Sequence, residues 1–534
     1  MTKLKNNYFK RLKYTCYFDK IVAISHVSSV ICAFLCVVLG LWMATSGVSN
    51  FRGVEGNVVF TIQKALLGSA IYTDPTAPPF DIAQYGPIYY IATILICNLF
   101  GIGGLDFSSV FAIGRLVSLS CLGVLVATVY FTLRKKLNVR QSYAVAACAF
   151  SIVATSPWYF LARPDAMVAF LIFASLHLAI PDDGATPSRK TLLVLSAIVL
   201  GFAAALVKLN GVQVVVAVIL YLIIVGDVRK LGIVLLACAV LATMLYFVAP
   251  WVFGKYVWDN VIDGVNNGIN PSMAIKKVYI RFGIIFCFPM FVFVYSAKKL
   301  DVMECPRSKF LLISAGFFFI FGTLTALKEG SALNYYNEFV VLGAMSIAFF
   351  FEKNAMLENM GVRSSIENLN FSGRLEWVMP VILLGVILPL ITIQRYATYF
   401  EAFRSPGSVC RAATERRIDR HQQAAQKLRR QLESGECQYV LAFGDFPAAL
   451  PDYCVLPQIE VAALCKKTGA LDFSQLGTLI DNGSIRYVVL PPGETINREV
   501  IGYNLNNYIN VWSSRYSYVY EHKKSHHKKK SFLF

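Results

Sequence analysis

Two acidic residues of the sequence stand where a carboxylate could act as a general base. Glu55 follows the first long apolar segment, and Asp165 ends the turn Ala-Arg-Pro-Asp that precedes another. A carboxylate at the end of a membrane span is partly desolvated, and neighbouring charges can tune its pKa for proton transfer. The structural alternatives are a solvated loop glutamate at position 55 and, for Asp165, an acid that stabilises a helix N-terminus.

Four basic residues near the ends of apolar segments could bind a phosphate. They are Arg115, Arg163, Lys208 and Lys328. Guanidinium and ammonium groups contact phosphate oxygens through bidentate or single charge-assisted hydrogen bonds. Any one of them could instead reach to a lipid headgroup, and Arg163 could pair with Asp165. Their convergence on one side of the membrane is what favours a bound anion.

A third group of polar and aromatic residues is suited to a sugar. It comes from a long Pro-rich stretch after Glu55 and from the segment 334–338, Asn-Tyr-Tyr-Asn-Glu. Such side chains hydrogen-bond sugar hydroxyls and stack against a pyranose ring. We assign substrate binding to Asp74, Asp81, Tyr85, Asn334, Tyr335 and Glu338. Polar packing between helices is the alternative for the segment 334–338.

The elements that must position these residues are membrane-spanning helices. Of the 534 residues, 56% are hydrophobic and 15% are charged, an apolar excess that a single soluble core does not bury. We expect a polytopic α-helical membrane protein with about eleven spans. They fall near 21–45, 110–133, 141–157, 164–180, 191–207, 211–226, 231–253, 278–297, 309–327, 338–352 and 377–394.

Loop charges predict the orientation. Residues 1–20 are basic, so the positive-inside rule places them in the cytoplasm. Every second later loop is also basic if residues 46–109 form one external loop, in which the apolar stretch 88–100 dips into the interface without crossing. The transmembrane domain then covers 21–395, and the candidate residues share its external side.

The C-terminal part, 396–520, is predicted to be a small α/β domain outside the membrane. Two short strands, near 438–443 and 485–490, are separated by helical sequence. Residues 521–534 form a basic tail that we expect to be disordered. The cysteines of this part form disulfides in an oxidising compartment or stay free; they are Cys410, Cys437, Cys454 and Cys465.

Several classes of site have no counterpart in the sequence. It has no Gly-rich phosphate loop, no paired-cysteine metal spacing and no HExxH. This argues against an ATP-driven pump and a zinc hydrolase, while carboxylates alone would still allow a divalent cation. The net charge of +18 lies in short clusters between apolar segments, which membrane topology explains better than binding to nucleic acid.

Four stretches resemble the GT-C superfamily of membrane glycosyltransferases, in particular bacterial family 39 with its aminoarabinose and protein-mannosyl transferases. The stretch 85–90, Tyr-Gly-Pro-Ile-Tyr-Tyr, resembles that family's Tyr-Pro-Pro-Leu-Tyr-Tyr element. The acidic first loop at Glu55, the turn at Asp165 and the segment 328–338 complete the likeness, which spans roughly residues 20–395. The relatives often carry Asp-Glu where this chain has Val54-Glu55, and a proline in place of Gly86.

The resemblance implies an activity and roles for these residues. Glu55 becomes the general base, Asp165 a second acidic participant, and the four cations the contacts of a donor phosphate. The reaction is an inverting transfer of a sugar from a polyprenyl-phosphate donor to a lipid or glycan acceptor. It takes place on the outer side of a membrane, which the resemblance indicates to be a bacterial inner membrane with the C-terminal domain in the periplasm.

Two other classes of function stay open at this point. A secondary transporter or flippase would use intramembrane charges to mark a substrate path, and a non-catalytic assembly subunit would need no site. Visible repeat symmetry is absent and the conspicuous polar residues gather on one side, which favours the transferase. The sequence does not identify the sugar or the acceptor.

Overall fold

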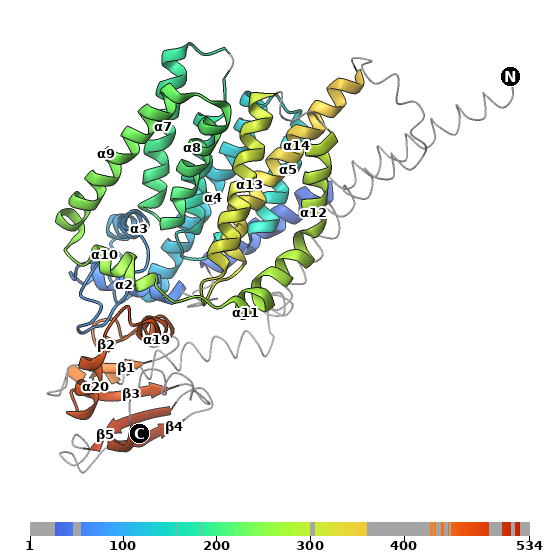
Figure 1. The fold of residues 1–534 in the computed structure, drawn as a ribbon. Helices are drawn as coiled ribbons and strands as arrows, with labels where there is room; N and C mark the ends of the chain where they lie inside the picture. Colours follow the sequence, from blue (N-terminus) through green and yellow to red (C-terminus); the bar gives the residue numbers. More distant parts are fainter. Residues whose placement is uncertain are drawn as a thin grey trace, which may run out of the picture.

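The computed structural model describes residues 27–45, 55–299 except 157 and 183, 305–359, and, in the C-terminal part, most of 428–490 with 505–513 and 518–523. Figure 1 shows a bundle of long helices and, beyond one end of it, a small domain built on a sheet. This is the predicted fold class, an α-helical membrane protein with a small C-terminal α/β domain.

The long helices coincide with the apolar segments of the sequence. In chain order they are Val27–Thr45, α4 (Phe107–Phe131), α5 (Gln141–Thr155), α6 (Asp165–Ala179), α7 (Pro187–Ala205), α8 (Gln213–Val225), α9 (Val228–Phe253), α12 (Ile280–Lys299), α13 (Pro306–Ala326) and α14 (Asn337–Asn359). Among the described helices, five are long and apolar enough to cross a membrane: Val27–Thr45, Phe107–Lys136, Pro187–Ala205, Val228–Phe253 and Pro306–Ala326. The span predicted at 377–394 lies outside the described residues.

Helix α9 shows most directly that the bundle is surrounded by lipid. Only Val234 and Ala249 of its 26 residues are buried, although the helix is apolar on all sides. A helix of this kind is stable where hydrocarbon covers the exposed side chains. The protein is therefore an integral membrane protein.

Short helices cap the end of the bundle that faces the C-terminal domain (Figure 1). They are α2 (Glu55–Leu66), α3 (Pro87–Leu99), α10 (Val257–Val261) and α11 (Pro271–Met273). Helix α3 begins with Pro87 at a position where the missing N–H is unused. Its 13 residues reach about 20 Å, less than the roughly 30 Å of a hydrocarbon core. Helix α3 coincides with the apolar stretch 88–100 of the sequence.

The C-terminal domain has a five-stranded mixed sheet in the order β2-β1-β3-β5-β4. The strands are β1 (Tyr439–Ala442), β2 (Cys454–Val455), β3 (Ile485–Leu490), β4 (Tyr508–Ser513) and β5 (Tyr518–His522). Helices α19 (Ile459–Thr468) and α20 (Ser474–Asp481) connect β2 to β3. Strand β1 is parallel to β2 and β3, and β5 is antiparallel to β3 and β4. The sequence predicted only β1 and β3, whose apolar runs are typical of buried parallel strands.

Two predictions for this domain need correction or completion. Glu521 and His522 belong to β5 and not to a disordered tail, because Glu521 accepts a hydrogen bond from Arg486 Nε at 3.2 Å and His522 is buried. Cys454 and Cys465 are buried free thiols. The other two cysteines, at 410 and 437, and the rest of the tail lie outside the described residues.

The loop between α2 and α3 and the C-terminal domain interlock at residues 79–82. The Phe80 side chain is buried in the core of the C-terminal domain, with its ring 6.2 Å from that of Phe473. The backbone N–H of Leu456 donates to the carbonyl of Pro79 at 2.8 Å. A piece of the membrane body therefore completes the core of the C-terminal domain.

Candidate active site

A cluster of charged and aromatic side chains surrounds Asp165 at the start of α6. Asp165 is the first residue of α6 and is 2% exposed. Its Oδ1 accepts hydrogen bonds from Lys208 Nζ at 2.8 Å and Asn334 Nδ2 at 3.1 Å. Arg163 Nε lies 3.0 Å from Oδ2, an ion pair without hydrogen-bond geometry. We call Tyr85, Arg163, Asp165, Lys208, Lys328, Asn334 and Tyr335 the Asp165 cluster.

Aromatic rings hold the two cations that pair with Asp165. Lys208 Nζ lies 5.8 Å from the ring centroid of Tyr85 and 5.3 Å from that of Tyr335. Arg163 stacks 5.2 Å over Trp158 and donates from Nη2 to the Tyr85 hydroxyl at 3.3 Å. Burial disfavours the charged ammonium, but Asp165 outweighs it and holds the pKa of Lys208 above its usual value. Both cations are thus kept charged at this site.

Two glycines allow the connections to approach closely enough to form the cluster. A Cβ on Gly86 would lie 2.0 Å from the carbonyl oxygen of Leu206, and one on Gly211 would lie 2.3 Å from the carbonyl carbon of Ala204. The N–H of Gly86 donates to the carbonyl of Val207 at 3.1 Å. This contact between two backbones places Tyr85 beside Lys208. No Cβ fits at either position without a backbone shift.

Lys328 is the member of the cluster with unused capacity. It is half-buried, and within the described residues its ammonium group makes no hydrogen bond or ion pair. Burial, with the nearby charge of Lys208, lowers the pKa of Lys328 to about 8. Two neighbouring ammonium groups, of which one has no counter-ion, make a site that an anion would stabilise.

A second polar layer lies next to the cluster, at the start of α8 and α14. The side chains there face each other in pairs, Gln213 beside Glu338 and Asn337 beside the Tyr159 hydroxyl. Neither pair has good hydrogen-bond geometry. Glu338 is within the electrostatic reach of Lys208 and Asp165. Buried polar groups in proteins are normally satisfied, so this layer is suited to hydroxyl groups of a ligand or to water.

Glu55 and Arg115 pair with each other. Arg115 Nε donates to Glu55 Oε1 at 2.8 Å and Nη2 to Oε2 at 2.9 Å. Glu55 Oε1 also accepts from the N–H of Ala162 at 2.8 Å, and Arg115 Nη1 donates to the carbonyl of Met43 at 3.1 Å. Both side chains are at most 1% exposed. The pair joins α2, α4 and the turn before Asp165, a structural arrangement that argues against a base at Glu55 and a phosphate contact at Arg115.

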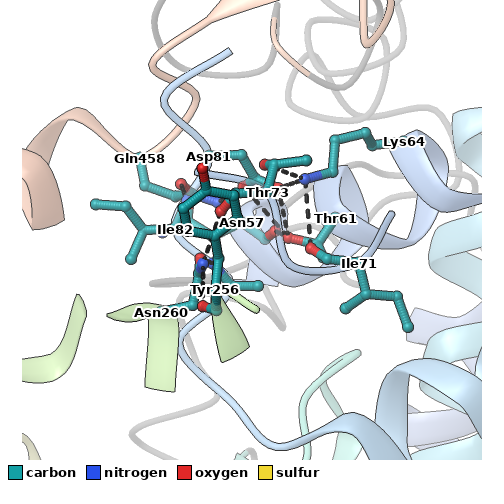
Figure 2. Close-up of polar contacts among 11 residues, drawn as sticks. Asn57, Thr61, Lys64, Ile71, Thr73, Asp81, Ile82, Tyr256, Asn260 and Gln458 are labelled. Carbon is teal, nitrogen blue, oxygen red and sulfur yellow. Dashed lines mark hydrogen bonds and ion pairs between the residues drawn. The ribbon is translucent and has the colours of Figure 1, made fainter. Parts of the chain in front are cut away.

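The two aspartates predicted to bind substrate are also engaged elsewhere. Asp81 is fully buried between α2 and the C-terminal domain, with Lys64 Nζ 2.5 Å from its Oδ2 (Figure 2). Asp74 accepts hydrogen bonds from the N–H and hydroxyl of Thr76 in a turn of the first loop. The structure does not bring either carboxylate into the Asp165 cluster.

Sequence reasoning missed Lys64 and Gln458, which contact Asp81 from two sides. Lys64 is buried in α2 together with Thr61 and Gln63, so a lysine next to an apolar run was the available signal. The sequence around Gln458 gives no such indication. A polar residue before a helix is common, and it does not predict a partner such as Asp81, 377 positions away. Among the described residues, no group of three or more His, Cys, Asp or Glu is placed to hold a metal ion.

Neither protein-family models nor curated sequences match this chain. Solved structures do. ArnT from Cupriavidus metallidurans bound to undecaprenyl phosphate superposes with a TM-score of 0.57 at 12% identity, over 92% of this chain and 97% of that one. The chain has a GT-C glycosyltransferase fold.

Other structures with the GT-C fold match to a similar extent. The Archaeoglobus fulgidus oligosaccharyltransferase tethered to an acceptor peptide has a TM-score of 0.56 at 12% identity, covering 93% of this chain and 74% of that one. The same archaeon's AglB with an inhibitory peptide and dolichol-phosphate has a TM-score of 0.52 at 13% identity, covering 91% and 71%. The match to ArnT includes almost the whole of both chains, so the C-terminal domain is part of the shared architecture.

Proposed function

We propose that the protein is a glycosyltransferase that takes a sugar from a polyprenyl-phosphate donor at the Asp165 cluster. The observation that carries the proposal is Lys328, a lysine without a counter-ion in the described residues, beside Lys208 and at the external end of a GT-C bundle. Two proteins of this fold, ArnT and AglB, were solved with undecaprenyl phosphate and dolichol-phosphate. A lipid phosphate is an anion of the right charge for the free cation.

The cations would act on the leaving group. When the bond between the anomeric carbon and the phosphate oxygen breaks, the polyprenyl phosphate gains negative charge. Arg163 and Lys208 both pair with Asp165, and Lys328 is near enough to Lys208 for their charges to interact. Together the three cations would stabilise that charge. The isoprenoid chain would remain in the bilayer, because the cluster lies at the end of the spans.

Asp165 is the carboxylate that we propose as general base. Its ion pairs with Lys208 and Arg163 keep it deprotonated in the free protein. A bound phosphate would compete for both cations, and Asp165 would then become more basic when the donor is in place. Asp165 would take the proton of the acceptor hydroxyl, whose oxygen attacks the anomeric carbon as the phosphate leaves with the bonding electrons. This single displacement inverts the anomeric configuration.

The polar layer at Tyr159, Gln213, Asn337 and Glu338 is proposed to receive the sugar. Its donors and acceptors face each other without good hydrogen-bond geometry, and together they match the mixed character of sugar hydroxyls. Tyr335 and Asn334 connect this layer to Asp165. A polar hexose or pentose would therefore be favoured over an apolar substrate.

The test is sugar release from a panel of radiolabelled polyprenyl-phosphate sugars by the purified protein. Asp165→Asn should lower the rate of sugar release at least about a hundredfold, because a general base typically accelerates a reaction by that factor or more. Asp481→Asn, at an exposed position of α20, is the matched control and should keep the parent rate. Donor-independent flux in proteoliposomes, with no turnover of any donor, would instead favour a transporter.

A further inference from the structure

Gln458, the residue before α19, holds the first external loop at two points (Figure 2). Its Oε1 accepts a hydrogen bond from the N–H of Ile82 at 2.7 Å, and its Nε2 donates to Asp81 Oδ1 at 2.6 Å. Gln458 is 2% exposed and Asp81 is fully buried. An amide carries its donor and its acceptor on two separate atoms, so one side chain without charge satisfies a carboxylate and an N–H at once.

The loop is held from the membrane body as well. Lys64 of α2 pairs with Asp81 and donates to the hydroxyl of Thr73 at 2.9 Å. Asn260 of α10 accepts from the N–H of Ala83 at 2.8 Å and donates from Nδ2 to the carbonyl of Thr73 at 2.8 Å (Figure 2). Gln458 is thus the contribution of the C-terminal domain to a joint that also involves α2 and α10.

The far end of α19 touches the connection that carries Lys328. Lys467 Nζ lies 2.9 Å from Glu329 Oε2, and the Thr468 hydroxyl donates to the carbonyl of Asn266 at 2.8 Å. The Cys465 thiol, buried, faces the carbonyls of Asp263 and Gly264 at 3.6 and 3.7 Å. One helix therefore spans from the loop that ends in Tyr85 to the residue next to Lys328, and both Tyr85 and Lys328 belong to the Asp165 cluster.

We infer that Gln458 is a positioning residue for the proposed transfer, through which α19 of the C-terminal domain sets the distance between the Tyr85 and Lys328 sides of the phosphate site. The inference rests on the proposed function for what binds there, but the mechanical joint is independent of it. Gln458 touches no reacting atom. It acts through Asp81 and Ile82 on the loop that continues to Tyr85.

The experiment compares Gln458→Ala with Gln475→Ala, a change of the same residue type at an exposed position of α20. Undecaprenyl phosphate is the probe, and its affinity is measured for each full-length protein. Because two buried partners lose their hydrogen bonds, Gln458→Ala should weaken the affinity by about tenfold or more. Gln475→Ala should bind as the parent does.

Maleimide labelling of native cysteines, mapped by mass spectrometry, separates a loosened joint from an unfolded domain. Cys465 faces the membrane body, and Cys454 lies inside the C-terminal domain. Burial raises the pKa of the Cys465 thiol to about 11, so it labels slowly while the helix is docked. Gln458→Ala should accelerate labelling of Cys465 by about tenfold and leave Cys454 protected.

A third variant, Gln458→Glu, adds a readout that general damage would not produce. The charged groups at this position are Asp81 and, beyond it, Lys64. When ionised, the introduced carboxylate would repel Asp81, whereas its protonated form donates to Asp81 and accepts from Ile82 as glutamine does. Relative to the parent, the affinity of this variant for undecaprenyl phosphate should therefore recover as the pH falls.

Each outcome bears on a different part of the inference. Equal Cys465 labelling in Gln458→Ala and Gln475→Ala would overturn the joint itself, whatever the protein binds. Faster Cys465 labelling with parent affinity for undecaprenyl phosphate would overturn the positioning role. A parent that binds no undecaprenyl phosphate would refute the proposed function and the positioning role, while the labelling would still decide on the joint.

Discussion

Replacing Glu55 by Gln should destabilise the fold, and this separates a structural carboxylate from a catalytic one. In the structure, both Glu55 oxygens accept from the Arg115 guanidinium at 2.8 and 2.9 Å, and neither side chain is exposed to more than 1%. Removal of one partner leaves the other charge buried and unpaired. That costs about 3–5 kcal/mol, or roughly two to four powers of ten in the folding equilibrium.

The assay is a thermal melt of the purified protein in one detergent, for Glu55→Gln, Arg115→Met and the double variant. Each single variant should melt well below the parent. The double variant removes both charges, so it should recover a large part of the loss, and the double-mutant cycle then gives the coupling of the pair. Glu460→Gln, at an exposed position of α19, is the control and should melt with the parent.

One result would refute this reasoning. If Glu55→Gln melts like the parent but no longer turns over a donor, then Glu55 acts in the chemistry and its pair with Arg115 contributes little to stability. In that case the general base would be Glu55, as the family resemblance implies, and Asp165→Asn should retain turnover.

Three further predictions concern the Asp165 cluster. Because the pKa of Lys328 is lowered to about 8, this lysine loses its charge between pH 7 and 9, and the affinity of the parent for undecaprenyl phosphate should fall over that range. The affinity of Lys328→Arg should not change with pH. If the affinities of both proteins fall in parallel, another group titrates. Gly86→Ala should lower the melting temperature and weaken phosphate binding, because its Cβ meets the carbonyl of Leu206 at 2.0 Å, while Gly103→Ala, with open space, should do neither. Arg163→Lys should raise the KM for the donor by about tenfold, because the change removes the stacking on Trp158 and the contact to the Tyr85 hydroxyl. An unchanged KM would show that the donor phosphate does not bind at Arg163.

The helices could be predicted because lipid imposes one simple requirement on them. Every spanning segment must be long, apolar and internally hydrogen-bonded, so hydrophobic runs indicated the positions of α4 to α9 and α12 to α14 within a few residues at most ends. The small strands of the C-terminal domain could not be found in this way. β2 has two residues, Cys454 and Val455, and is a strand only because β1 lies beside it.

The candidate site was partly predictable for a similar reason. Residue types singled out Arg163, Asp165, Lys208 and Lys328 as candidates, since charges are rare at span ends, and the structure brings these four together. The pairing of these charges depends on which loops, far apart in the sequence, lie side by side in the fold. Arg115 was expected near a phosphate, but Glu55 occupies it; Asp81 was expected near a substrate, but it faces Lys64 and Gln458.

The burial of Phe80 in the core of the C-terminal domain constrains how the chain is made. The joint links residues up to 377 positions apart, so the ribosome finishes the second half of it roughly 20–75 s after the first at about 5–20 residues per second. Throughout that interval the loop around Phe80 and Ile82 has no partner for its apolar side chains. The C-terminal domain, in turn, is never complete as an independent unit, because three of its core side chains, Phe60, Phe80 and Ile82, arrive from the membrane body. When the C-terminal domain is expressed alone, it should be soluble only if a peptide that covers residues 79–83 of the loop is added.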